Sequence, residues 1–522
     1  MKKLSIKIIL GIICVIPFNV ALSQGVTGSV DLETVKTVAK NYCLKTEEKY
    51  TQASDNDITL TLADYKKSGS GVLYYIFNID YKGNNGEGDG YIIMSATYDQ
   101  PPVLAYIPQG SYDATKAALN TGFTDWLNAF ADQIEYSLKT KAENSANEQL
   151  WSAYLAKGKM DSEEMLLNLT SKWDQTSNFN YYSPQHGSTG KCPTGCVATA
   201  MGQVMYYYKW PDNITGSHSY TDAANPNGNS SCGSSDPSYG ELSFSSDLSI
   251  NWGGMVDRPS GVNLDISQLL YNCAVSVDMD FAYCQSWTNT YYAAPAYSTY
   301  FGYQSSATYI LRDDHPSDWE SIMIEQIRNE KPVHYRGVNG GGGGHSFVLM
   351  GYKIVTGANQ FWFNWGWSGD SDGFYTLNSL LFANNQGAII NIAPPVQPNL
   401  SFTAASVAST PIYTRVVNSI DFTIENNGTR GALSSTAACY LSTDQTLDKN
   451  DVLLTTIDVA ALSTNESIDR SANITVDVET GGTYYLLFEA DTDHKVHESN
   501  EANNVTAVEV QVIVSPAVAG EF

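Results

Sequence analysis

Three segments of this 522-residue chain carry side chains that can do covalent chemistry. In the first, Cys196 opens a run of apolar residues at helical spacing that Pro211 closes. The thiol of Cys196 therefore lies in the first helical turn, where the positive end of the helix dipole lowers a thiol pKa and favours the nucleophilic thiolate. Gly195 before it leaves space for a substrate backbone. Taken alone, this segment also fits a buried structural cysteine.

The second segment begins with the glycines at 340–344 and continues with His345. We expect a mobile glycine loop followed by a strand that places His345, Phe347 and Leu349 on one face. At such a junction a histidine is held rigidly and can still be reached by substrate, as a general base requires. A structural histidine is the alternative for this segment alone.

The third segment is an aromatic strand that ends in Asn364, Trp365, Gly366 and Trp367. A side-chain amide at Asn364 can orient an imidazole or an oxyanion donor, and the two tryptophans can shield such a pair from water. A plain core strand is the alternative here. The order of Cys, His about 150 residues later and then Asn-Trp follows the logic of papain-like cysteine proteases, so together the segments predict a Cys–His hydrolase.

No metal and no cofactor are expected. Cys192 and Cys196 are spaced too loosely for a zinc site, and no second Cys/His pair follows them. Seven cysteines remain beyond Cys14, an odd number, so at least one thiol stays unpaired within the chain.

The N-terminus predicts export. Lys2, Lys3 and Lys7 precede an apolar run over 8–18, and small residues at 21 and 23 mark a cleavage site before Gln24. Residues 1–23 are therefore predicted to be a signal peptide, and the product secreted or at the cell surface. The alternative, a membrane anchor, is disfavoured because the run is too short to cross about 30 Å of hydrocarbon.

Composition indicates a globular, acidic protein. Hydrophobic residues make up 43% of the chain, and 29 basic against 55 acidic residues give a net charge of −26. Such a charge excludes the positive footprint that nucleic-acid binding needs, and we expect neither nucleic-acid binding nor membrane insertion.

Three units follow the signal peptide. An N-terminal unit (24–160) contains predicted strands and an amphipathic helix over 123–138. A central unit (161–393) holds the three chemical segments, and a proline-rich linker (394–398) follows it. A C-terminal unit (399–513) has short alternating strands separated by turns, which predicts an all-β sandwich.

At the level of motifs, the central unit resembles the streptopain (C10) family of cysteine peptidases. The matching segments keep the family's order and spacing; they are 194–200, 276–280, 318–320, 332–333, 343–345, 364–367 and 371–374. The resemblance implies an α+β chain: a papain-like peptidase domain between an α+β inhibitory prodomain and a sandwich that resembles CARDB domains.

The same resemblance implies roles for individual residues. Cys196 would be the nucleophile and His345 the general base, with Asn364 or the backbone near Trp365 orienting the ring. The substrate-binding residues would be Gly195, Trp287, Gly344 and Trp367. The chain would be a zymogen, inhibited by its own prodomain until cleavage near 157–162, and would act on proteins or peptides.

Two positions depart from the family pattern. Family members often place a polar donor six residues before the nucleophile, where this chain has Gly190, and Gln185 further upstream is the alternative donor. Trp287 stands where streptopain has a substrate-contacting serine, so the pocket should differ in shape. Cys192 could form a reversible disulfide with Cys196 or pair elsewhere.

Two other functions use the same residues. The chain could be a catalytically inactive adhesin or binding protein that presents its sandwich, although intact Cys196 and His345 weigh against this. It could also be a transferase that captures the acyl group with an amine.

Overall fold

The computed structural model describes residues 29–50, 53–82, 89–119, 121–140, 145–156, 160–187, 190–223, 237–246, 248–338, 344–377 and 384–515. The predicted signal peptide, most of the glycine run and positions 157–159 of the expected cleavage segment lie outside these residues. Within them, no helix has the length and apolar character needed to span a membrane.

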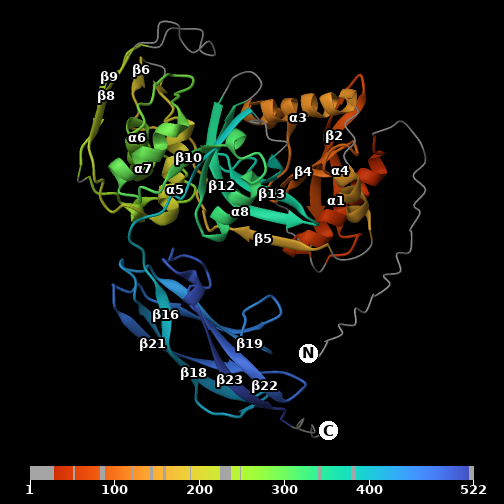
Figure 1. The fold of residues 1–522 in the computed structure, drawn as a ribbon, viewed down its shortest axis with the longest axis vertical. Coiled ribbons are helices and arrows are strands. Elements are labelled where there is room, and N and C mark those ends of the chain that lie inside the picture. The colour runs from red at the N-terminus through yellow and green to blue at the C-terminus, as the bar shows by residue number, and fades with distance from the viewer. Residues whose placement is uncertain are drawn as a thin grey trace, which may run out of the picture.

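One eleven-stranded sheet runs through both the N-terminal and the central unit (Figure 1). Its order is β1-β2-β3-β4-β14-β13-β12-β11-β15-β10, and β5 also pairs with β12. All of its pairs are antiparallel. The strands are β1 (Ile58–Ser68), β2 (Gly71–Tyr81), β3 (Tyr91–Ser95), β4 (Val103–Ile107), β5 (Ser162–Leu166), β10 (Thr308–Leu311), β11 (Val333–Val338), β12 (Gly344–Val355), β13 (Ala358–Asn364), β14 (Gly373–Tyr375) and β15 (Asn384–Ile390).

Helices flank this sheet in both units. The N-terminal unit contains α1 (Leu32–Thr46), α2 (Ala114–Leu119), α3 (Thr121–Thr140) and α4 (Ser145–Leu155). The central unit contains α5 (Cys196–Tyr208), α6 (Leu264–Val275), α7 (Ala293–Phe301) and α8 (Trp319–Arg328), with the short hairpins β6 (Gln185–His186) to β7 (Gly190–Lys191) and β8 (His218–Asp222) to β9 (Gly240–Phe244). Single 3-10 turns are η1 (Glu48–Tyr50), η2 (Trp252–Gly254), η3 (Thr290–Tyr292) and η4 (Arg312–Asp314).

Helix α5 is the most deeply packed helix of the central unit. Every residue from Val197 to Tyr208 is buried. Gly202 allows α6 to come close, because a Cβ there would lie 2.3 Å from Leu270. The helix begins at Cys196 and ends at Tyr208, where Lys209 takes the left-handed conformation that commonly closes a helix. The predicted helix from Cys196 is thus confirmed.

The C-terminal unit is a β-sandwich, as predicted. One sheet has the order β16-β18-β21 and the other β17-β23-β22-β19-β20. Buried side chains alternate along β18, where Ile420, Phe422 and Ile424 face the core. The strands are β16 (Leu400–Val407), β17 (Ile412–Tyr413), β18 (Val417–Asn426), β19 (Ser435–Ser442), β20 (Val452–Val459), β21 (Ser467–Thr475), β22 (Gly482–Glu489) and β23 (Val505–Ile513), with the 3-10 turn η6 (Glu501–Asn503).

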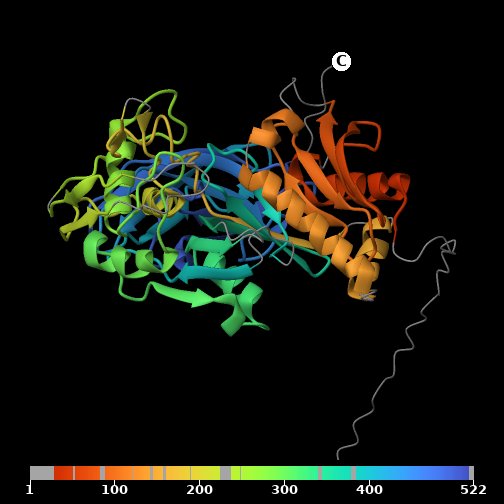
Figure 2. The ribbon, with the colours of Figure 1, turned by 90° about the horizontal axis from the view of Figure 1, so that it is seen from above.

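The sandwich contacts the central unit at the C-terminal end of α5. Arg430 donates to the carbonyl of Lys209 and pairs with Asp212, both at 2.9 Å. The ring of His497 lies 3.7 Å from that of Tyr207. In Figure 1 the blue sandwich lies below the other two units, which stand side by side, and the turned view in Figure 2 shows the same side-by-side arrangement.

The N-terminal unit docks through buried polar groups as well as through the sheet. The ammonium of Lys353, on β12, is fully buried and contacts Glu47 of the N-terminal unit at 2.5 Å and Glu164 of β5 at 2.7 Å. Tyr42 donates to the amide oxygen of Gln360 at 2.6 Å. A buried ammonium needs its partners, so Glu47 ties α1 to the central sheet.

We expect Glu47→Gln to weaken this docking, because Lys353 then keeps only Glu164 as a charged partner. The loss should be about 1.5–3 kcal/mol, as for a hydrogen bond to a charged group. A urea titration of the intact chain carrying Cys196→Ala, followed by tryptophan fluorescence, measures it. The control is Glu33→Gln on the same helix, an exposed glutamate paired with Lys36, which should change little. Equal midpoints for both variants would contradict the assignment.

Candidate active site

Cys196 occupies the N-terminus of α5, as the sequence predicted, and is half-buried. Gly195 before it has φ 87° and ψ 146°, a conformation reserved for glycine. A Cβ at Gly195 would lie 2.6 Å from the end of the Met279 side chain. The backbone therefore turns sharply into the helix at this point, which leaves the thiol at the positive end of the helix.

His345 is the second residue of β12 and is half-buried. Its Nε2 lies 2.9 Å from the carbonyl oxygen of Trp365. The Trp367 ring stacks on the imidazole, with centroids 5.0 Å apart and planes 20° from parallel, and Phe347 lies near it at 5.6 Å. The predicted shielding of His345 by tryptophan thus has a geometric basis in Trp367.

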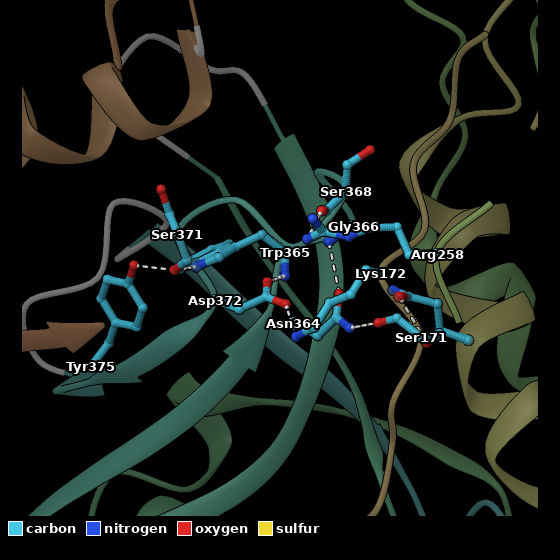
Figure 3. A network of polar contacts seen from close by, with 11 residues as sticks. Ser171, Lys172, Arg258, Asn364, Trp365, Gly366, Ser368, Ser371, Asp372 and Tyr375 are labelled. Carbon is cyan, nitrogen blue, oxygen red and sulfur yellow. Dashed lines mark hydrogen bonds and ion pairs between the residues drawn. The ribbon is translucent and has the colours of Figure 1, made fainter. Parts of the chain in front are cut away.

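The Asn364 amide holds the turn that presents this carbonyl. Its nitrogen donates to the Ser171 carbonyl at 2.7 Å, and its oxygen accepts from the N–H of Gly366 at 3.0 Å (Figure 3). Asn364 is completely buried. Of the two partners considered for His345, the Trp365 backbone is the one that contacts Nε2 at hydrogen-bonding distance.

Trp365 is fixed by groups that follow it in the chain. Its backbone N–H donates to Asp372 and its indole N–H to the Ser371 carbonyl, both at 3.0 Å. Asp372 is buried and paired with Lys172 at 2.8 Å, and Tyr375 donates to the Ser371 carbonyl (Figure 3). Burial raises the pKa of Asp372, while the Lys172 ammonium favours its charged form.

Cys196 and His345, the candidate nucleophile and base, lie on two elements that pack together, α5 and β12. The backbone N–H of Ser346, the residue after His345, acts to lower the pKa of the Cys196 thiol. Burial raises the pKa of the Cys196 thiol, against the smaller effects of the N–H groups of Ser346 and Val197. Burial also lowers the pKa of His345 to about 4, against its hydrogen bond to Trp365. Both groups are therefore uncharged at neutral pH unless they charge together as an ion pair.

The four predicted substrate-binding residues lie at this site or near it. Gly195 precedes the thiol, Gly344 is the exposed first residue of β12, and Trp367 covers the His345 ring. Trp287 is 52% exposed and is joined to Asp280 by two backbone hydrogen bonds of 3.0 Å.

In the β6–β7 hairpin, upstream of Cys196, the side-chain amide of Gln185 forms hydrogen bonds within the hairpin. The amide of Gln185 donates to the carbonyls of Gly187 and Gly190 at 3.2 and 2.9 Å, within the β6–β7 hairpin. Cys192 and Cys196 are not joined by a disulfide, and the Cys192 sulfur contacts the Tyr239 hydroxyl at 3.2 Å. Cys284 is disulfide-bonded.

Sequence reasoning missed the groups that hold the site from a distance. Ser171 and Lys172 precede Asn364 and Asp372 by 193 and 200 residues, so no local pattern joins them. Asp372 lies within one of the quoted motifs, and a buried carboxylate there could have been suspected. The contact of Met279 with Gly195 gives no signal in the sequence.

Family models match all three units. Residues 173–375 match the peptidase C10 family, residues 27–134 the Spi protease inhibitor and residues 397–508 CARDB. The resemblance and the fold class inferred from the sequence are therefore confirmed.

Individual relatives agree with these matches. Streptopain of Streptococcus pyogenes is 27% identical over 372 residues, which cover 65% of this chain and 86% of streptopain. The thiol protease/hemagglutinin PrtT of Porphyromonas gingivalis is 28% identical over 367 residues, or 68% of this chain. The chain spans only 39% of the length of PrtT.

Solved structures of two related proteins from Prevotella intermedia align with the chain. A prointerpain A fragment is 24% identical with a TM-score of 0.48, covering 63% of this chain and 98% of the fragment. Active interpain A cysteine protease is 30% identical with a TM-score of 0.38, covering 43% of this chain and 94% of that protein. Through residues 173–375 of its central unit, the chain thus matches the peptidase C10 family.

Proposed function

We propose that the protein is a secreted cysteine endopeptidase, made as a zymogen, that hydrolyses peptide bonds of proteins or peptides. The observation that carries this is the placement of Cys196 at the start of α5, a helix that packs against β12, the strand of His345. The binding-protein alternative is not favoured, because nucleophile and base are both present in a peptidase-family unit.

The geometry supports a division of roles between the two ring nitrogens of His345. A carbonyl oxygen can only accept, so Nε2 must carry the proton shared with Trp365. In the neutral ring Nδ1 then holds the lone pair and is the atom that takes the proton from Cys196. In this proposal the Trp365 carbonyl orients His345, and Asn364 acts one step back by fixing the turn.

The proposed reaction runs in two steps. The Cys196 thiolate attacks the scissile carbonyl, the Cys196 N–H stabilises the oxyanion, and His345 protonates the leaving amine as the acyl thioester forms. His345 then takes a proton from water, the resulting hydroxide displaces the thiolate, and the carboxylic acid leaves. Trp365 and Trp367 limit water around the ring.

Latency would come from the N-terminal unit. Its strand β4 pairs with β14, and the Tyr91 hydroxyl contacts that of Ser371 at 3.2 Å, next to the turn that orients His345. The match to an inhibitor family supports reading 24–160 as a prodomain that is released by cleavage near 157–162. The other parts of the proposed domain organisation are a signal peptide (1–23) before the prodomain and, after it, the peptidase domain (161–393), a linker (394–398) and the sandwich (399–513).

Hydrolysis of casein under reducing conditions tests the proposal. The chain 24–522 should lose its N-terminal unit and gain activity, whereas Cys196→Ala and His345→Ala should stay whole and lose activity about 10³-fold or more. Cys439→Ala, a free thiol in the sandwich, is the matched control and should behave like the parent. Full activity of Cys196→Ala would refute the proposal.

Gly195→Ala should lower kcat/KM about 10²-fold, because a side chain is strained at φ 87° and meets Met279 at 2.6 Å, displacing the thiol. Gly261→Ala is the control, since a Cβ there meets nothing within 4 Å. Kinetics on one fluorogenic peptide after conversion compares the variants, and an unimpaired Gly195→Ala enzyme would show that this turn does not set the nucleophile.

The depressed pKa of His345 predicts a pH-dependent stability. Because its pKa is about 4 in the folded chain against an ordinary 6.5, the unfolded chain binds the proton first between these values. The contribution of neutral His345 to the free energy of unfolding is therefore complete above pH 6.5. It is lost as the pH falls toward 4, by at most about 1.4 kcal/mol per pH unit. Unfolding of Cys196→Ala with and without His345→Gln measures this, and a difference that is constant with pH would contradict it.

A further inference from the structure

A single segment contacts both the loop that precedes the nucleophile and the strand that carries the base. It covers residues 276–292, from the end of α6 to the 3-10 turn η3 (Thr290–Tyr292). The proposed mechanism uses no residue of this segment, of which only Trp287 is predicted to contact substrate. Two of its hydroxyl side chains, Ser286 and Thr290, are nevertheless almost completely buried, with 2% and 4% exposed.

Ser286 contacts the nucleophile loop. Its hydroxyl donates to the carbonyl of Pro193 at 2.7 Å and accepts from the N–H of Ala282 at 3.3 Å. Pro193 lies three residues before Cys196, so this bond ties the approach to α5 to the segment. Met279, from the same segment, also packs against the position of Gly195.

Thr290 contacts the strand of the base. Its hydroxyl lies 2.6 Å from that of Ser346, which is itself 2% exposed. Ser346 follows His345 on β12, the strand against which α5 packs. A displacement of Ser346 would therefore move the His345 ring relative to Cys196 at the start of α5.

The segment 276–292, which carries these two hydroxyls, is held by further hydrogen bonds and by a disulfide. Asp280 and Trp287 exchange two backbone hydrogen bonds of 3.0 Å, and Thr288 donates to the Val277 carbonyl at 2.7 Å. Tyr220 of β8 donates to the Met279 carbonyl, and Cys284 is held by a disulfide. Ser286 and Thr290 are thus four residues apart on a braced segment, at a separation that is hard to change.

We propose that Ser286 and Thr290 are positioning residues, which hold the nucleophile loop and the base strand at the separation that proton transfer between Cys196 and His345 requires. They act through Pro193 and Ser346, which their hydroxyls contact. This inference rests on the proposed function. Because misplacement of reacting groups by about 1 Å can lower a rate about 10²-fold, the effect should be large in kcat.

The test compares the full chain, after conversion, with Ser286→Ala, Thr290→Val and the double variant. Each single variant should lower kcat about 10- to 100-fold while KM changes less than about 3-fold, since the loss lies in the chemical step. Thr290→Ser, which restores the hydroxyl, should recover most of kcat. Ser298→Ala on α7, an exposed hydroxyl that donates to the Pro295 carbonyl at 3.2 Å, is the matched control.

A second readout does not depend on peptidase activity. The rate of iodoacetamide alkylation of Cys196, followed by peptide mass spectrometry across pH, reports the thiolate paired with His345. In the parent, formation of the Cys196–His345 ion pair should make the thiol react with iodoacetamide below the pH range of an ordinary cysteine, and both variants should lose this reactivity. If the parent hydrolyses nothing, the proposed function fails, while this comparison still decides the positioning.

Three results would contradict the positioning role of Ser286 and Thr290. Variants with parental kcat and parental alkylation profiles would overturn the inference. Variants that melt at lower temperature but, while folded, keep the parental alkylation profile would show that the hydroxyls only stabilise the fold, and would overturn it too. A loss that Thr290→Ser does not recover would assign the Thr290 effect to packing of its methyl group instead.

Discussion

The hydrogen bond between the His345 ring and the Trp365 carbonyl is the interaction on which the site depends. It fixes both the orientation of the ring and the nitrogen that carries the proton. The carbonyl can do this only because its own turn is rigid. Asn364 joins that turn to Ser171, and Asp372 joins it to Lys172. A buried amide and a buried ion pair thus fix the carbonyl that orients the His345 ring.

The same turn is where the N-terminal unit meets the central sheet. β14 begins at Gly373, directly after Asp372, and a Cβ at Gly373 would lie 2.5 Å from the carbonyl of Tyr106 in β4. Only glycine permits that approach. A unit that resembles a protease inhibitor therefore rests against the turn that supports His345, and one continuous sheet joins the two units.

Local patterns predicted the elements but not their long-range supports. The helix at Cys196, the strand at His345 and the aromatic strand ending at Asn364 were each readable, because side-chain periodicity reports local structure. The expected alternation in β12 was incomplete, since Ser346 and Val348 are buried like Phe347. Both faces of this central strand are covered, so burial does not alternate.

Partners far apart in sequence were beyond prediction. Asn364 and the backbone near Trp365 are the two predicted partners of His345; the Trp365 carbonyl contacts the ring, while the Asn364 amide binds Ser171 and Gly366. Nor does any pattern near Arg430 show that it would reach the end of α5. Such pairs depend on how sheets and helices pack, which the spacing of residues within one element does not encode.

The pairing of β4 with β14 has a consequence for the form of the protein that the proposed removal of the N-terminal unit would leave. β14 is three residues long, and only two residue pairs link it to β4. Its departure would turn β14 into a free sheet edge, and free edges invite pairing between molecules and aggregation. An edge this short offers few unpaired groups to a foreign strand. After the proposed removal, the exposed edge at β14 would therefore offer little backbone for pairing with another chain.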